Sequence, residues 1–259
     1  MTTWTPFPYD DTDYHYPEAQ LKEHWSRLHL GDAEPAPKDK NLLTAWQAFH
    51  AGQFEQAMKL GLEHPEPAGY AVANKAQAIY ATYLEKNEKQ KLRLFEQVAE
   101  RALEHQAADP MAANAWYWHA YALGRYAQGL SIAKALKGGV GGKIRNSLEQ
   151  TLMLEPKHAD AHLALGTYHA EIIDKIGAMI GGLTYGANKE QGMQHFQKAL
   201  KLNPDSAIAR IEFANGLVML EGDKRMKEAE KLYAQAAQCK PLDAMEKLDV
   251  ELARSELED

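Results

Sequence analysis

The densest group of side chains able to do chemistry lies between residues 116 and 126. It includes Trp116, Tyr117, Tyr121 and Arg125. Tryptophan and tyrosine combine an apolar ring with a polar tip, and arginine pairs with carboxylates, so these residues suit the anchoring of a peptide or a small ligand. The alternative is that the rings simply fill thick interfaces between helices. Both interpretations stay open from the sequence.

A second group lies further along the chain, beside an apolar stretch, and completes the predicted binding residues. Its members are His169, Glu171, Asp174, Lys175 and Tyr185. Lys134, in an earlier segment, adds another cation. We expect Arg125, Lys134 and Lys175 to pair with acidic groups of a partner.

Histidines raise the question of a metal site. His158 and His162 are four residues apart, and His169 follows on the same predicted helix. A zinc site needs a third ligand and an ordered second shell, and no His-Glu-x-x-His motif is present. We expect His158 to be exposed in the first turn after Pro156, and His162 to be packed and hydrogen-bonded. The sequence therefore predicts no bound metal.

The chain shows no arrangement typical of an enzyme. Cys239, the single cysteine, has no partner base visible in the sequence, and we expect a small buried thiol. The segment GGVGGK at 138–143 resembles a phosphate-binding loop in its glycines, but no Ser or Thr follows the lysine. No G-x-S-x-G motif occurs. We expect no catalytic residues and no cofactor.

Composition excludes several classes of protein. The 259 residues carry 29 basic and 36 acidic side chains, a net charge of −7, and no long basic run, so nucleic acid is an unfavourable partner. No stretch approaches the ~18 consecutive apolar residues of a membrane-spanning helix. Residues 1–13 lack the basic and apolar regions of a signal peptide. We expect a cytoplasmic protein.

A repeat positions these groups on helices. The pattern Pro-x-x-Ala-x-Ala begins at Pro110, Pro156 and Pro204, and we expect each proline to open a helix. Three of the prolines are preceded by a series of residues at positions i, i+4 and i+7. The first residue of the series is small or apolar, the second is bulky and the third is small. This spacing places the three residues on one face of a helix. These series are Ala229, Tyr233, Ala236 before Pro241; Gly192, Phe196, Ala199 before Pro204; and Ile144, Leu148, Thr151 before Pro156. The spacing resembles the second-helix signature of tetratricopeptide (TPR) repeats.

The resemblance implies an all-α TPR-like solenoid of antiparallel helix pairs over residues 38–259, ending in a capping helix. Residues 1–37 form a predicted N-terminal extension with a short helix near 17–30 and a Pro-rich linker. Its first 16 residues are extended, disordered or docked on the body. We expect further helices at 38–51, 54–63, 68–86, 88–106, 111–129, 143–154, 157–175, 188–202, 205–221, 224–239 and 242–257.

The repeat is irregular because two segments are inserted. Pro110, Pro156, Pro204 and Pro241 are 46, 48 and 37 residues apart, whereas a TPR repeat spans 34. The extra residues lie at 130–143 and 171–187. Each segment places a short apolar run before a pair of glycines, at 138–139 and 181–182. We expect the helix to break there, with glycine permitting either a positive φ or a close approach of backbones.

These insertions make the resemblance more specific than a general likeness to TPR proteins. The stretch from Tyr121 to Leu217, including GRYAQGLSIAKALKGGVGGKI, LEPKHADAHLALGTYHAEII and HFQKALKLNPDSAIAR, resembles two related groups. One is the helical T component associated with TRAP-type substrate transporters. The other is the regulator of microtubule dynamics family, whose helix pairs carry similar insertions and a similar LxP-x-x-A spacing. The resemblance implies a TPR bundle with insertions and is compatible with a homo-oligomer, but it transfers neither a substrate nor a partner.

Two functions follow as hypotheses. The first is a non-enzymatic TPR-type scaffold that binds a protein or peptide on its concave face. The alternative is a small-molecule-binding protein, with a lipid or an organic acid in a pocket built from 130–143 and 171–187. The apolar side chains at 176, 179, 180 and 183 would line that chamber or plug it. An exposed groove favours the first function, and an enclosed cavity above ~300 Å³ favours the second.

Overall fold

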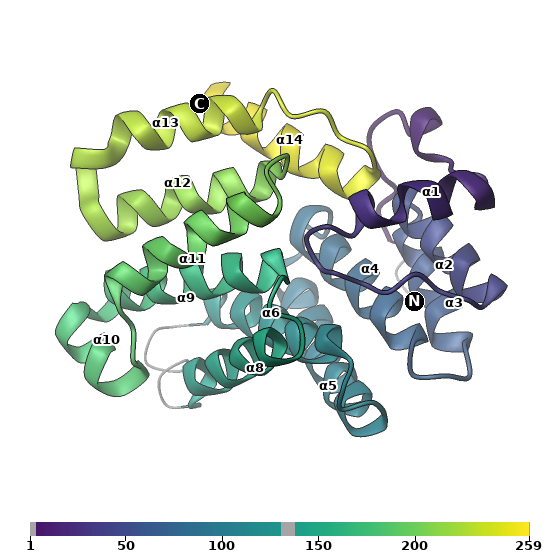
Figure 1. Ribbon diagram of the computed structural model, residues 1–259, viewed down its shortest axis with the longest axis horizontal. Coiled ribbons are helices and arrows are strands. Elements are labelled where there is room, and N and C mark those ends of the chain that lie inside the picture. The colour runs from purple at the N-terminus through teal and green to yellow at the C-terminus, as the bar shows by residue number, and fades with distance from the viewer. Residues whose placement is uncertain (1–3, 131–137, 259) are drawn as a thin grey trace. The chain divides into compact units, whose positions relative to one another are not determined.

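The computed structural model describes residues 4–130 and 138–258, and every regular element in these ranges is a helix (Figure 1). The prediction of an all-α fold is thereby confirmed. The chain divides into two compact units. Unit 1 comprises Met1–His29, Glu34–Leu154 and Leu242–Met245, and unit 2 comprises Leu30–Ala33, Glu155–Pro241 and Glu246–Asp259.

Unit 1 is a row of helix pairs. It begins with the short 3-10 helix η1 (Thr12–Tyr14) and α1 (Glu18–Leu28). The paired helices are α2 (Lys40–His50), α3 (Phe54–Glu63), α4 (Gly69–Tyr83), α5 (Glu88–Ala108), α6 (Ala113–Gln128) and α8 (Val140–Leu154). Each helix packs on the next, and the first helices of successive pairs, α2, α4 and α6, also contact one another. This is how TPR-like pairs bury their apolar faces, since each pair contacts only its neighbours.

Unit 2 repeats this plan with one extra helix. Its elements are α9 (Ala159–Ile176), α10 (Ala178–Tyr185), α11 (Lys189–Leu202), α12 (Ala207–Glu221), the 3-10 helix η2 (Gly222–Arg225), α13 (Met226–Ala236) and most of α14 (Ala244–Glu258). α9 pairs with α11 and α12 with α13, while α10 is inserted within the first of these pairs. Val250 and Ala253 of α14 pack against α12 and α13, as a capping helix would.

The repeated prolines stand before their helices rather than inside the first turn. Pro110, Pro156 and Pro204 each lie two residues after one helix ends and three residues before the next begins. Each therefore prevents the preceding helix from continuing. Capping falls instead to His158 and Ser206, whose side chains accept backbone N–H bonds of 3.0 and 3.1 Å from the residues three positions on.

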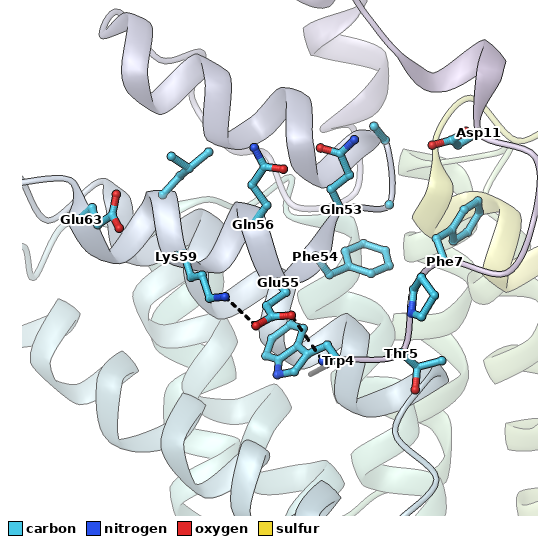
Figure 2. A pocket seen from close by; sticks show the side chains of 14 residues that line it. Trp4, Thr5, Phe7, Asp11, Gln53, Phe54, Glu55, Gln56, Lys59 and Glu63 are labelled. Atoms are coloured by element: carbon cyan, nitrogen blue, oxygen red, sulfur yellow. Dashed lines mark hydrogen bonds and ion pairs between the residues drawn. The ribbon is translucent and has the colours of Figure 1, made fainter. Parts of the chain in front are cut away.

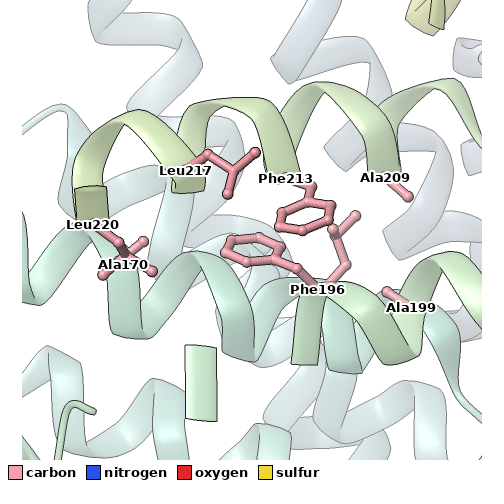
Figure 3. Close-up of a cluster of buried hydrophobic side chains, with 8 residues drawn as sticks. Ala170, Phe196, Ala199, Ala209, Phe213, Leu217 and Leu220 are labelled. Atoms are coloured by element: carbon pink, nitrogen blue, oxygen red, sulfur yellow. The ribbon is translucent and has the colours of Figure 1, made fainter. Parts of the chain in front are cut away.

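The core of unit 2 is built around one aromatic ring (Figure 3). Phe196 of α11 is fully buried and stacks on Phe213 of α12, with ring centroids 5.3 Å apart. A Cβ atom on Gly166 of α9 would lie 2.7 Å from this ring, and one on Gly216 of α12 would overlap it. The small residues of the repeat thus leave space into which the bulky one fits.

The core of unit 1 contains polar groups. Every residue of α4 from Ala71 to Ala81 is buried. Among them, the Lys75 ammonium lies 5.7 Å from the centroid of the Trp46 ring and 5.1 Å from that of Phe49. Nearby on α2, the Nδ1 atom of buried His50 lies 2.7 Å from a carboxylate oxygen of buried Asp243. This pair connects the segment Leu242–Met245 to the first helix pair.

Residues 4–16 dock on unit 1, which is one of the alternatives that the sequence left open. The Trp4 ring stacks on Tyr80 of α4 at 4.1 Å, and Tyr14 is buried. The Tyr16 hydroxyl donates a 2.6 Å hydrogen bond to the carbonyl of Leu242. The separate N-terminal extension over residues 1–37 stays a prediction.

One glycine pair does not act as predicted. Gly181 and Gly182 lie inside α10, so they do not break a helix. Gly181 is buried, and a Cβ there would lie 2.9 Å from the side chain of Ile172 on α9, so the residue permits close packing. The chain changes direction at Gly177 and Gly186, whose φ angles are 81° and 63°.

Candidate functional site

The aromatic group of α6 is mainly packed inside unit 1. Tyr117 is buried and meets Trp118 edge to face, with ring centroids 4.9 Å apart. Trp116 is half-buried, and its indole N–H donates a 3.1 Å hydrogen bond to the carbonyl of Pro110. The geometry therefore gives Trp116 and Tyr117 structural contacts, which is the alternative interpretation of this group.

Two residues of this group keep part of their surface accessible. Tyr121 is half-buried, and its hydroxyl lies 2.8 Å from the Thr82 hydroxyl on α4. The Arg125 guanidinium lies 5.3 Å from the centroid of the Tyr121 ring and donates to the side chain of Gln128 at 3.3 Å. Tyr121 and Arg125 both lie on α6, the first helix of its pair. Lys134 lies outside the described residues.

The second predicted group holds α9, α10 and α11 together. His169 is buried, and its Nδ1 atom accepts a 3.1 Å hydrogen bond from the backbone of Asn188. The hydroxyl of Tyr168 donates to the carbonyl of Tyr185 at 3.0 Å. These bonds attach the inserted helix to α9, so His169 and the backbone of Tyr185 position the insertion.

The charged members of this group lie at the accessible end of α9. Lys175 and Glu171 form an ion pair of 2.9 Å, one turn apart. Asp174 is exposed beside them. The predicted residues of unit 1 lie on α6, and those of unit 2 lie around α9 and α10.

Helix α10 carries the most exposed large apolar side chains among the described residues of unit 2. Met179, Ile180 and Leu183 are 79%, 57% and 86% exposed. Their spacing places them on one face of the helix, and α10 contains no charged residue. In the structure these three side chains face solvent in unit 2. The chamber or plug expected from this segment together with 130–143 stays a prediction, since 131–137 lie outside the described residues. We define these three residues as the α10 patch.

The prediction for His158 is wrong, whereas His162 is half-buried and hydrogen-bonded as predicted. His158 is fully buried rather than exposed, because its Nδ1 atom caps α9. His162 lies beside His195 of α11, with their Nδ1 atoms 2.9 Å apart. The Nε2 atom of His162 lies 3.2 Å from the carbonyl of Pro156, which only accepts, so His195 is the donor to His162. Burial lowers the pKa of His195 to about 4, with contributions from His162 and His169.

The described residues form neither a metal site nor a reactive cysteine site. In the ranges that the structure describes, no group of three or more His, Cys, Asp or Glu side chains is placed to hold a metal ion. Cys239 is half-buried rather than buried, and its thiol lies 3.5 Å from the carbonyl of Gln235. None of the helices in these ranges is long and apolar enough to span a bilayer.

Sequence reasoning missed a groove in unit 1 (Figure 2). It has a volume of about 530 Å³ and lies between the docked N-terminal segment and the outer face of α3. Trp4 and Phe7 form one wall, and Phe54, Gln56 and Glu63 belong to the other. The signal was present in the aromatic residues of WTPFPY, but only the tertiary structure shows that they dock beside α3.

Comparisons with known proteins agree with this architecture. A family model described as regulator of microtubule dynamics protein 1-3 matches residues 42–258. A comparison with curated proteins finds no match. The crystal structure of a thermophilic TPR protein from Thermus thermophilus matches with a TM-score of 0.58 at 17% sequence identity, covering 83% of this chain and 97% of that one. This likeness shows the fold alone, and the resemblance to TRAP T components stays a prediction.

Proposed function

The chain belongs to the regulator of microtubule dynamics family, and from this premise we propose that it is a non-enzymatic adaptor that binds a protein or peptide. The TPR-like fold supports the proposal, because stacked helix pairs present extended surfaces to partners. The observation that carries it is the α10 patch. Contiguous apolar side chains exposed to water mark interaction surfaces in folded proteins.

The α10 patch is suited to a macromolecular partner. Met179, Ile180 and Leu183 project from a short helix that is held at its base by the bond between Tyr168 and the carbonyl of Tyr185. An apolar helix face on a rigid base can enter a groove of a partner without a large loss of conformational entropy. Methionine adds a side chain that adapts to irregular surfaces.

The charged end of α9 supplies specificity. Asp174 is exposed, and Glu171 and Lys175 form an ion pair beside α10. Charged groups at the rim of an apolar contact steer association and disfavour wrong partners more than they add affinity. We place Glu171, Asp174 and Lys175 in this role, with the apolar residues as the anchor.

The concave face remains part of the proposal. The first helices of unit 1 contact one another in a row, and Tyr121 and Arg125 are partly accessible on α6. Tyrosine and arginine are frequent anchors in interfaces because they combine apolar area with hydrogen bonding. We propose these two residues as a second contact, for an acidic segment of the partner.

Exposure of the α10 patch favours a partner over an internal ligand. A small-molecule pocket would bury most of its ligand among apolar side chains, whereas the three side chains of the patch face solvent in unit 2. The other half of the predicted pocket falls partly in residues 131–137, outside the described residues. The protein-binding adaptor is therefore the function that we propose.

The test compares two triple variants of the full chain. In the first, Met179, Ile180 and Leu183 are changed to serine. In the matched control, three equally exposed apolar residues of unit 1 are changed to serine: Leu103, Met111 and Met153. Partners are captured from the native host and quantified by mass spectrometry. We expect the first variant to lose specific partners by about tenfold or more, as for removal of interface anchors, and the control to retain them. Equal recovery with both variants would contradict the role of the α10 patch.

A further inference from the structure

The groove beside α3 is a second, independent candidate for binding. One wall is the docked segment Trp4–Phe7, and the other is the outer face of α3. The docked wall is fixed by side chains: the backbone N–H of Trp4 donates to Glu55 at 3.3 Å, and that of Thr5 donates to the Tyr80 hydroxyl at 3.3 Å. Phe7 packs against Gly52, where a Cβ would lie 2.7 Å from the ring. The groove is therefore a built feature of unit 1.

Its charge favours a cationic ligand. The lining residues include three carboxylates, of Asp11, Glu55 and Glu63, and one ammonium, of Lys59. Lys59 is already paired with Glu55 at 2.6 Å, so its charge is largely compensated. The ion pair with Lys59 also lowers the pKa of Glu55 and keeps it ionised. Glu63 forms no hydrogen bond or ion pair with any residue that the structure describes.

Its remaining groups fit an extended peptide. Gln53, which immediately precedes α3, and Gln56 within α3 are both exposed (Figure 2). Their side chains make no hydrogen bond with the described parts of the chain, and each amide offers both a donor and an acceptor, as a peptide backbone requires. Gln53, Gln56 and Glu63 extend along α3 for ten residues, or about 15 Å, which equals four or five residues of extended chain. Trp4 and Phe7, which are both half-buried, provide apolar surface for alternate side chains.

From these observations we propose that the groove between residues 4–7 and α3 binds a short extended peptide segment that alternates apolar and basic residues. A basic side chain pairs with Glu63, because Asp11 and Glu55 are already paired with His15 and Lys59, and the apolar side chains pack on Trp4 and Phe7. This site lies in unit 1, so it is distinct from the α10 patch and does not depend on the proposed function.

Three synthetic octapeptides test the proposal on the full-length protein by isothermal titration calorimetry. The first alternates Lys and Leu, the second Glu and Leu, and the third Lys and Ser. We expect the first to bind about tenfold or more tightly than either of the others, and its affinity to fall as salt is raised. Side-chain amide signals of Gln53 and Gln56 in NMR spectra should shift with it. Equal affinity for the Glu–Leu peptide, or no binding of any peptide, would overturn the proposal.

Two variants and a control locate the binding. Glu63→Lys reverses a charge on an exposed residue at the end of α3, where a cation is favourable for the helix, so the fold is kept. We expect this variant to weaken binding of the Lys–Leu peptide by about fivefold or more. The control Glu230→Lys makes the same change on an exposed residue of α13 and should leave the affinity for the peptide unchanged. Trp4→Ala should also weaken binding. If Glu63→Lys and Glu230→Lys act alike, the effect is one of net charge and the assigned site is wrong.

Discussion

Unit 1 and unit 2 are built from the same helix pairs, yet their interiors are held together differently. Unit 1 buries the His50–Asp243 pair and the Lys75 ammonium. Unit 2 also buries polar groups such as His158 and His169, but its hydrophobic core is built around the Phe196 ring, which lies between Gly166 of α9 and Gly216 of α12. A buried polar pair destabilises the protein when one of its two members is removed. A tightly packed apolar core destabilises the protein when atoms are added to it. The repeat pattern therefore predicts where the helices lie, but it does not predict which side chains pack between them.

The largest effect is expected in unit 1. His50→Leu removes one member of a fully buried pair, so the buried Asp243 carboxylate loses its hydrogen bond with His50. We expect a loss of about 3–5 kcal/mol in the free energy of unfolding, measured by urea denaturation. The double variant His50→Leu, Asp243→Leu should recover a substantial part of this loss, because the Asp243 carboxylate is then no longer buried. A loss as large in the double variant would show that shape, rather than pairing, matters here.

The next largest loss of stability is expected in unit 2, where it comes from adding atoms to the core rather than from removing a polar partner. Gly216→Ala adds one methyl group against the buried Phe196 ring, which is confined by Gly166 and Phe213. We expect a cost of about 1–3 kcal/mol, as for other overpacked cores, in the same denaturation assay. The control is Gly124→Ala in α6, where a Cβ meets nothing within 4 Å. That change should stabilise the protein by about 0.5–1 kcal/mol through helix propensity.

Acidification should affect both units. Burial lowers the pKa of His105 in unit 1 and of His195 in unit 2 to about 4, below the ordinary value of 6.5. Above pH 6.5 both residues are neutral in the folded and unfolded chain. Between pH 6.5 and 4 the unfolded chain binds protons that the folded one does not, so stability falls as the pH is lowered.

The contribution of His105 to this loss is up to about 3 kcal/mol, and that of His195 is smaller because it is partly solvated. Urea denaturation at about pH 7, 6, 5 and 4 measures the total, and NMR titration of each imidazole assigns it. We expect His105→Gln to flatten the dependence more than His195→Gln. An imidazole that titrates near its ordinary pKa in the folded protein would contradict its assigned burial.

The smallest effect on stability is expected at the α10 patch. Serine at positions 179, 180 and 183 replaces side chains that already contact water. The free energy of unfolding should therefore change by no more than about 0.5 kcal/mol per residue. The same variant is expected to lose its partners. Thermal and urea unfolding measure the first property and partner capture the second. A large loss of stability would mean that these side chains are covered in solution.

Sequence patterns predicted the elements well where periodicity was strong. The face formed by Gly192, Phe196 and Ala199 is buried as predicted, because small and bulky residues at helical spacing have few other ways to pack. The prediction that the glycine pair of α10 breaks the helix was wrong, whereas the close approach that these glycines also permit occurs where Gly181 meets Ile172. The prediction for His158 was wrong because its capping bond depends on where α9 begins.

The candidate sites were predicted less well than the fold. Trp116 and Tyr117 are engaged in packing, whereas Met179 and Leu183 are exposed, and residue type alone does not separate these cases. The groove beside α3 was missed because its two walls are about 50 residues apart in sequence, and only long-range docking brings them together.

By itself the sequence determined an all-α chain of TPR-like pairs with two insertions, because helical periodicity and proline spacing act locally along the chain. Only the tertiary structure decided which aromatic rings are buried, that α10 faces water, and that Trp4 stacks on Tyr80. Burial depends on what each helix face meets, and a helix meets segments far away in sequence. The position of each helix is thus a local property, and the exposure of its side chains is not.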